Sequence, residues 1–272
     1  PVAEKITIES TGYKAPLDET DDRLSKTGRV VIAEAAFAAA GCFIRTDLLV
    51  RENGVYHLYE VKAKSFKSEE GELEEESITD AHQFLKKRDP GVDGKWAPYV
   101  YDLAFQKWVM QKALPKAKIK AHLLLVDKTV NVSIDGMNQL FKLVKDGDRT
   151  RVEVAEGLTQ EKLGKIPLKA INCDEIIEKV WNEFPVPGYD NLDFESFVVN
   201  MQQNYAADKR EWTEIGSHCG GCQFYSDGSD GLKSGFHECW KKHTRLSDEE
   251  LRQPLVTDLW KGNGGQHLGK II

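Results

Sequence analysis

The chain has 272 residues, of which 40% are hydrophobic and 30% charged, and its formal net charge is −7. This length can bury a substantial core, and the composition is typical of a soluble protein of one or two domains. The charge excludes a wholly basic nucleic-acid coat but is compatible with a local basic groove. The sequence has no signal peptide and no long apolar run, so a cytoplasmic protein without membrane association is expected. It begins at Pro1 without an initiator methionine, as a piece of a longer protein would.

The first forty residues predict an irregular segment followed by a helix. Residues 1–28 are polar without a clear period, and we expect an irregular lead-in with a short strand at 5–9. Residues 30–40 are rich in alanine and apolar except for Glu34, and Gly41 is a typical helix C-cap, so they predict a buried helix. A lone carboxylate in such a helix must be paired, bound to a metal or turned to solvent.

Residues 43–65 predict a β-hairpin. Its turn is Asn53-Gly54, because a two-residue type I′ turn needs positive φ at both central positions and these residue types tolerate it. In an unbulged hairpin with this turn, Asp47 lies opposite Glu60. Directly opposed like charges destabilise a sheet, so this pair needs a stabilising partner. A divalent cation between the two carboxylates would be such a partner.

The same register predicts a cluster of charges on one face of the hairpin. Side chains alternate along a strand, so Glu60 and Lys62 point the same way while Val61 points to the opposite face. Arg45 then falls opposite Lys62. The alternative to a metal site is a solvated polar face on which Arg45, Lys62 and Lys64 balance the carboxylates, and a register inferred from a turn can slip.

Polar segments and regular elements alternate beyond the hairpin. The acidic run at 69–76 predicts a solvated loop, and residues 77–88 predict a short helix. Residues 119–126 are nearly all apolar, as in a strand buried on both faces, so His122 within them is expected to belong to the core. Two further helical patterns follow a polar stretch, at residues 173–183 and 193–205.

Residues 99–113 predict a helix that carries a polar face. Asp102 and Gln106 are four residues apart and therefore lie on one side of the helix, together with Tyr99. Pro115 ends the pattern. From the residues alone, Gln106 is either part of a site or an ordinary surface position on an amphipathic helix.

Five cysteines without a secretory signal favour metal ligation or buried thiols over disulfides. Cys219-Gly220-Gly221-Cys222 predicts a tight thiolate knuckle, because the glycines let the backbone fold round a metal. Cys239 adds a third thiolate, whereas zinc sites and cubane clusters take four ligands. The alternative is three unligated cysteines in a reduced cytoplasm. Candidates for a fourth ligand are Cys173, His218, His237 and His243.

These motifs together resemble a superfamily of nucleases. Asp47, followed after the hairpin by Glu60-Val61-Lys62, is similar to the Asp…Glu-x-Lys signature of the PD-(D/E)XK nucleases. The chain resembles in particular the RecB-like branch, with its CRISPR-associated iron-sulfur exonucleases and a related family of uncharacterised bacterial proteins. The other motifs that carry the resemblance are Glu34-Ala35-Ala36-Phe37, Asp102-Leu103-Ala104-Phe105-Gln106 and Cys219-x-x-Cys222 with Cys239. They are scattered over residues 32–260.

The resemblance implies an α/β fold with a restriction-endonuclease-like core, in which helices flank a mixed central sheet. It implies a nuclease core at 1–130 that contains an insertion at 66–98. A C-terminal helical extension at 131–272 would follow, with the cysteine metal knuckle packing back on the core. In the iron-sulfur relatives the fourth cysteine lies far upstream, whereas no cysteine precedes Cys42 here. If Pro1 marks a truncation, that ligand lies in the missing part.

The implied activity is metal-dependent hydrolysis of phosphodiester bonds in DNA, at single-stranded or duplex ends, by an exonuclease rather than an endonuclease. Asp47, Glu60 and the carbonyl of Val61 would hold Mg²⁺ or Mn²⁺. Lys62 would orient the attacking water and offset the charge of the transition state. Glu34 would complete the metal shell directly or through water.

The resemblance also implies contacts with the nucleic acid and a second metal centre. Gln106 and Tyr99 would contact the nucleic acid, although Met110 replaces the tyrosine that commonly follows this glutamine. The three cysteines of the knuckle would hold a [4Fe–4S] cluster, or zinc, in a structural role. A further nucleic-acid-processing domain, fused to the chain or acting with it, would be the partner besides DNA.

Two other functions are compatible with the sequence. The first is a non-catalytic nucleic-acid-binding or scaffolding module that keeps the fold and the structural metal knuckle. The acidic net charge favours it, while the intact Asp47, Glu60 and Lys62 argue against it, because a binding module has no need of opposed carboxylates. The second is a zinc-ribbon-like element around Cys219 that docks a partner protein.

Overall fold

A computed structural model describes residues 5–68, 79–88, 90–147, 149–186, 188–189, 191–211, 215–229 and 231–258. The chain divides into two compact units, residues 1–202 and 203–272. The domain boundary predicted at residue 130 lies inside the first unit. None of the described helices is long and apolar enough to cross a lipid bilayer.

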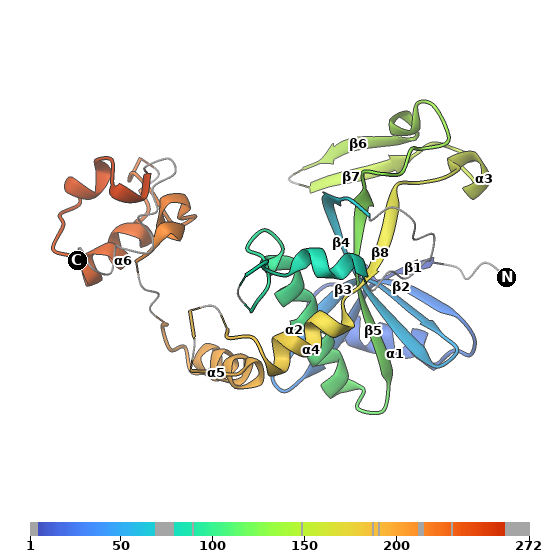
Figure 1. The fold of residues 1–272 in the computed structure, drawn as a ribbon, viewed down its shortest axis with the longest axis horizontal. Helices are drawn as coiled ribbons and strands as arrows, with labels where there is room; N and C mark the ends of the chain where they lie inside the picture. Colours follow the sequence, from blue (N-terminus) through green and yellow to red (C-terminus); the bar gives the residue numbers. More distant parts are fainter. Residues whose placement is uncertain are drawn as a thin grey trace. The chain divides into compact units, whose positions relative to one another are not determined.

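The first unit is an α/β fold with a mixed six-stranded central sheet flanked by helices, as predicted (Figure 1). The strand order is β1-β2-β3-β4-β5-β8, with parallel pairing between β1 and β2 and between β4 and β5, and antiparallel pairing elsewhere. The strands are β1 (Lys5–Thr7), β2 (Val30–Ala39), β3 (Cys42–Glu52), β4 (Val55–Phe66), β5 (Lys118–Asp127) and β8 (Leu168–Asn172).

Helices cover this sheet at several places. α2 (Ala97–Ala113) crosses strands β2 to β5, and α4 (Asp174–Asn182) packs beside it against β5. α1 (Lys14–Ser25) packs on β2, and α5 (Phe194–Ala206) follows α4 in the chain. The main core lies between α2 and the sheet, and the largest fully buried side chain in it is Trp96.

The helix predicted at residues 30–40 is wrong, because Val30–Ala39 form strand β2. Alanine favours helices in isolation, but pairing with β1 on one edge and β3 on the other overrides that propensity. Ala40 and Gly41 have φ values of 50° and 72°. They form the tight turn of the β2–β3 hairpin. Gly41, which the sequence pattern predicts as a helix C-cap, therefore belongs to a β-turn instead.

The predicted β3–β4 hairpin is confirmed over its described pairs. Asn53 and Gly54 have φ values of 49° and 77°, as a type I′ turn requires. The ladder runs from Glu52 paired with Val55 to Leu48 paired with Tyr59, in the predicted register. The predicted helices at 99–113, 173–183 and 193–205 and the predicted strands at 5–9 and 119–126 are present as α2, α4, α5, β1 and β5.

Several segments differ from the prediction or extend it. The lead-in contains α1, and the polar stretch after β5 contains the hairpin β6 (Phe141–Asp146) and β7 (Arg149–Val154) and the short α3 (Gln160–Leu163), none of which was predicted. The segment predicted as a short helix at 77–88 contains a 3₁₀ turn at Thr79–Phe84, η1. The acidic run at 69–76 lies outside the described residues.

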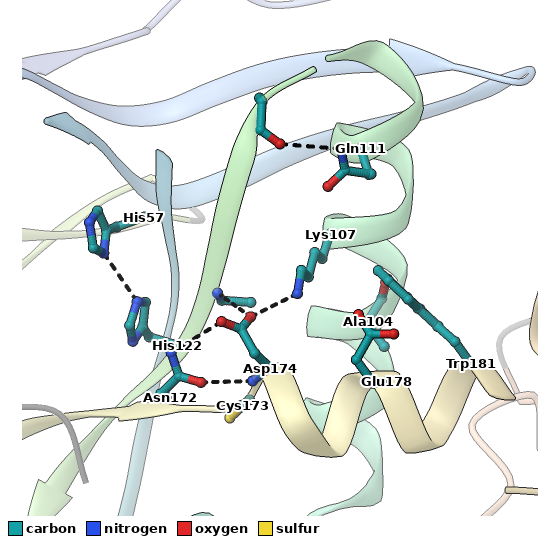
Figure 2. A network of polar contacts seen from close by, with 12 residues as sticks. His57, Ala104, Lys107, Gln111, His122, Asn172, Cys173, Asp174, Glu178 and Trp181 are labelled. Carbon is teal, nitrogen blue, oxygen red and sulfur yellow. Dashed lines mark hydrogen bonds and ion pairs between the residues drawn. The ribbon is translucent and has the colours of Figure 1, made fainter. Parts of the chain in front are cut away.

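A partly buried ion pair joins α2 to α4 and β5 (Figure 2). Lys107 on α2 is 6% exposed, and its Nζ donates to Oδ1 of Asp174 at 2.8 Å. The same oxygen accepts the backbone N–H of Ala121 at 3.0 Å, and Nδ2 of Asn172 donates to Oδ2 at 3.2 Å. The start of α4 is thereby fixed against α2 and β5. His122 on β5 is 1% exposed, as predicted for a core residue, and its ring stacks on that of Tyr59.

The second unit is small and has its own core. Among its described residues the longest complete helix is α6 (Gly235–His243), and the core consists of Phe236, Trp240 and Leu251. Three 3₁₀ turns surround it: η3 (Ser217–Gly221), η4 (Glu250–Arg252) and η5 (Val256–Asp258). The metal-knuckle cysteines lie in this unit.

Candidate functional site

Four of the predicted site residues meet where α2 passes the β3–β4 hairpin. Glu60 on β4 is 3% exposed and is bonded at both carboxylate oxygens. Nζ of Lys62 donates to its Oε1, and Nε2 of Gln106 on α2 donates to its Oε2 at 2.7 Å. Asp47 on β3 accepts the backbone N–H of Val61 through Oδ2 at 2.7 Å. The sequence signature is therefore a contiguous polar cluster in the fold.

Irregular strand pairing shapes this cluster. The described β3–β4 ladder stops at Leu48–Tyr59, one residue short of the predicted Asp47–Glu60 pair. β4 stays paired with β5 up to Val61 and resumes at Ser65, and the register shifts between them, so that residues 62–64 form a bulge-like irregularity. A bulge changes the direction of its side chains, and here Lys62 and Lys64 lie over the Tyr99 ring of α2.

The charges of the cluster are unbalanced. Burial raises the pKa of Glu60, the bonds from Lys62 and Gln106 lower it, and the carboxylates of Asp102 and Asp47 raise it further, with a net increase. Burial alone would lower the pKa of Lys62, but its bond to Glu60 and the charges of all three carboxylates raise it overall. The ammonium group of Lys62 therefore faces three carboxylates. The excess negative charge favours the binding of a further cation.

Asp102 is the member of this cluster that was not predicted as a site residue, although it belongs to one of the sequence motifs. Its Oδ2 lies 3.7 Å from Nζ of Lys62, and its Oδ1 accepts Nε2 of Gln106 at 3.1 Å. The four-residue spacing from Gln106 was visible in the sequence. The contact with Lys62 was not, because it depends on how α2 docks on the sheet.

Gln106 and Tyr99 both border the cluster. Gln106 is 5% exposed, so it is not an ordinary surface position, and its Oε1 is buried without a hydrogen-bond partner among the described residues. Both bonds from Nε2 go to carboxylates, which leaves Oε1 able to accept from a water or ligand. Tyr99 lies with its ring centroid 5.7 Å from Nζ of Lys62.

Glu34 lies on strand β2 rather than on the predicted helix. The β2–β3 pairs on either side of it set it opposite Asp47, and the ladder is interrupted at that position. Its φ is 62°, a strained value for a residue other than glycine. The Glu34 carboxylate lies 3.3 Å from Nε of Arg45, whose other nitrogens donate to the carbonyls of Ile8 and Ser10. Glu34 is therefore next to Asp47 in register but held by Arg45.

A metal site is not preassembled in the part of the chain that the structure describes. No group of three or more His, Cys, Asp or Glu side chains there is arranged to hold an ion. The charges of Asp47 and Asp102 nevertheless raise the pKa of Glu60, and Lys62 is bonded to Glu60 and close to Asp102. Asp47, Glu60 and the Val61 carbonyl offer only oxygen, which suits Mg²⁺ or Mn²⁺.

The three predicted knuckle cysteines lie in the second unit, and their described side chains, like the carboxylates of the first unit, are not preassembled round an ion. Cys219, Cys222 and Cys239 line one pocket of about 510 Å³. Burial raises the pKa of Cys239, and the neighbouring Cys219 and Cys222 raise it further. Gly220 allows the knuckle to pack closely, since a Cβ there would lie 2.6 Å from the carbonyl oxygen of Thr257.

The candidates for a fourth ligand differ in their surroundings. His218 lines the same pocket as the three cysteines. His237 is 6% exposed, and its Nδ1 lies 2.9 Å from Asp248. Cys173 is fully buried in the core of the first unit, and burial raises its pKa to about 12, as expected for a core thiol. His218 is thus the candidate that shares the pocket.

Comparison with known proteins gives no match: no family model, no curated protein and no solved structure is similar enough to the chain. Membership of the nuclease family that the motifs resemble stays a prediction. The structure itself defines a coarser class, an α/β protein with a cluster of carboxylates and a lysine between the central hairpin and α2.

Proposed function

We propose that the chain is a metal-dependent nuclease with a restriction-endonuclease-like core that hydrolyses phosphodiester bonds in DNA. The observation that carries the proposal is the bonding of Glu60, a buried carboxylate held by Lys62 and Gln106 beside Asp47 of the neighbouring strand. A structural role alone does not require three carboxylates round one lysine, because such a group destabilises the fold.

The residues of the cluster fit a hard divalent cation. Asp47, Glu60 and the carbonyl of Val61 would hold Mg²⁺ or Mn²⁺, which prefer oxygen ligands. The bound ion would lower the pKa of water and polarise the phosphate. Two features support the fit: the excess of carboxylates over ammonium groups, and the buried Oε1 of Gln106, which lacks a partner among the described residues.

The chain's own residues would hold and stabilise the reacting groups. Lys62 would turn from Glu60 toward the phosphate and stabilise the negative charge that develops there. Asp102, 3.7 Å from its Nζ, would keep Lys62 in position during that change. Gln106 would orient Glu60 and accept a hydrogen bond from water through Oε1. Glu34, in an ion pair with Arg45, would reach the metal shell through water.

Removal of divalent metal is expected to abolish DNA cleavage, because the carboxylates alone repel the phosphodiester. Protein treated with EDTA should leave labelled single-stranded and end-labelled duplex DNA intact, and added Mn²⁺ or Mg²⁺ should restore degradation. The Asp47→Ala variant, purified identically, controls for contaminating nucleases and should stay inactive with metal. If the wild type degrades no nucleic acid with any divalent ion, the enzymatic proposal fails. DNA binding that survives Asp47→Ala would then favour the non-catalytic module.

For the second unit we propose a structural metal centre held by Cys219, Cys222 and Cys239, with His218 as the fourth ligand. The donor set fits, since thiolate and imidazole bind zinc, and thiolates bind iron-sulfur clusters. The shared pocket of the four residues supports it. The centre would hold the η3 turn against α6.

Substitution of both knuckle cysteines, Cys219→Ser with Cys222→Ser, is expected to remove this metal and to loosen the second unit. Elemental analysis of the purified protein should find iron with sulfide, or zinc, in the wild type but not in the variant. A brown colour distinguishes the cluster from zinc. Cys42→Ser, a half-buried cysteine of the first unit, is the control and should retain the metal. Wild-type protein with neither metal, or a variant that keeps it, would contradict the assignment.

A further inference from the structure

A rigid aromatic platform lies beside the candidate active site, at the start of α2. Trp96 is 2% exposed and packs on Phe84, with ring centroids 4.6 Å apart. Tyr99, one turn along α2, meets Trp96 edge-on at 6.4 Å. Because Trp96 is locked in the core, groups that rest on these two rings are held in fixed positions.

Lysine ammonium groups cover this platform. Nζ of Lys64 lies 5.1 Å from the Trp96 centroid and 4.7 Å from that of Tyr99. Nζ of Lys95 lies 5.0 Å from the Trp96 centroid. Lys64 also donates to the Lys95 carbonyl at 2.6 Å, which ties the bulge of β4 to the loop before α2. Cation–π contacts of this kind orient side chains that are otherwise flexible.

Lys64 and Lys95 differ from Lys62 in how their positive charges are compensated. Lys62 is paired with Glu60 and lies near Asp102. Within the described ranges neither Lys64 nor Lys95 takes part in an ion pair. Asp93 lies near Lys95 in the chain, and its carboxylate accepts the backbone N–H of Lys95 at 3.0 Å. Each ammonium group lies about 5 Å from the same Trp96 centroid, so the two like charges are close enough to repel each other. An anion placed between them would relieve that repulsion.

We propose that Lys64 and Lys95 form a second phosphate-binding position, which holds a phosphate of the nucleic-acid strand next to the one at Lys62. The assignment of the strand as substrate rests on the proposed function. Lysine is a point-charge ligand for phosphate, and lysines that follow the backbone are typical of single-strand binding. Because Lys62 and Lys64 share the ring of Tyr99, the two positions adjoin.

The proposal specifies the substrate of the site. A position for a flanking phosphate requires a strand with at least two successive phosphodiesters, so the preferred substrate is a polynucleotide rather than a mononucleotide ester. The binding is to the backbone, and it therefore carries no base preference and weakens with salt.

Salt-dependent binding tests this position without any turnover. Binding of a fluorescein-labelled oligothymidine is measured by anisotropy in EDTA for the wild type and for Lys64→Ala with Lys95→Ala. Each neutralised phosphate contributes about 0.7 to the salt slope of a single strand, so the double variant, which loses this one position, should lose about 0.7 and bind more weakly at low salt. The charge-preserving pair Lys64→Arg with Lys95→Arg should retain the wild-type slope.

A matched pair of lysines serves as the control. Lys116 and Lys118 are exposed, and Lys118 pairs with Val55, at the end of the β4–β5 ladder away from residues 60–64. Lys116→Ala with Lys118→Ala removes the same charge and should leave the slope nearly unchanged. An unchanged slope for the Lys64/Lys95 variant, or an equal loss in the control, overturns the proposal. Failure of metal-dependent cleavage would instead overturn the nuclease proposal, because the binding assay needs neither metal nor catalysis.

Discussion

Replacement of Glu60 by glutamine is expected to reduce metal-dependent cleavage by about a thousandfold or more. The substitution keeps the size of the side chain but removes the negative charge, and the new amide can accept from only one of the two donors, Lys62 and Gln106. An amide oxygen is a much weaker ligand for Mg²⁺ or Mn²⁺ than a carboxylate, and the remaining Asp47 carboxylate would hold the ion poorly. Single-turnover cleavage of a labelled DNA strand at saturating protein measures the loss.

The same variant is expected to fold normally. Glu60 is 3% exposed and its pKa is raised by burial, so its charge is unfavourable in the folded chain. Lys62 keeps Asp102 as a partner after the change. The lost bond and the relief of the buried charge act in opposite directions, so the free energy of unfolding should change by no more than about 2 kcal/mol, as measured by urea denaturation followed by tryptophan fluorescence.

A glutamate outside the site provides the matched control. Glu175 on α4 is exposed and forms an ion pair with Lys179, so Glu175→Gln removes the same charge without touching the cluster. This control should cleave DNA as the wild type does. Full activity of Glu60→Gln would show that Glu60 is not a metal ligand, and an unfolded variant would show that its charge serves the fold. Either result contradicts the assignment of Glu60.

Local chemistry explains which parts of the fold could be predicted. The β3–β4 hairpin follows from Asn53-Gly54, whose backbone preferences act within four residues. Strand β2 could not be recognised, because its alanine-rich sequence favours a helix and only pairing with β1 and β3 reverses that preference. Gly41 suits a helix cap and a β-turn equally, since both need positive φ.

The candidate site could likewise be predicted only where it depends on local structure. Asp47, Glu60 and Lys62 belong to one hairpin, so their proximity follows from its register. Asp102 and the contacts of Lys64 depend on two tertiary features, the bulge at residues 62–64 and the docking of α2. Neither of these two features can be inferred from the spacing of residues in the sequence.

Removal of Asp174 is expected to destabilise the first unit far more than removal of its partner Lys107 (Figure 2). Asp174→Ala leaves the Lys107 ammonium, on a side chain only 7% exposed, without its carboxylate, and it leaves the N–H of Ala121 without its acceptor. Breaking a buried pair in this way costs about 3–5 kcal/mol. Lys107→Met leaves a carboxylate that is 30% exposed and still accepts from Ala121 and Asn172, so its cost should be about 1–2 kcal/mol.

Urea unfolding of the two single variants and the double variant separates these contributions. The double variant, Lys107→Met with Asp174→Ala, should be more stable than Asp174→Ala alone, because it contains no unpaired buried ammonium. Lys179→Met breaks the exposed pair with Glu175 and should cost less than about 1 kcal/mol. Equal losses of stability in the two single variants would show that the burial of Lys107 does not decide which substitution costs more. Gln106, which bonds to Glu60, directly precedes Lys107 on α2. A large loss of stability in Asp174→Ala would therefore also show that the network in Figure 2 stabilises the helix that carries Gln106.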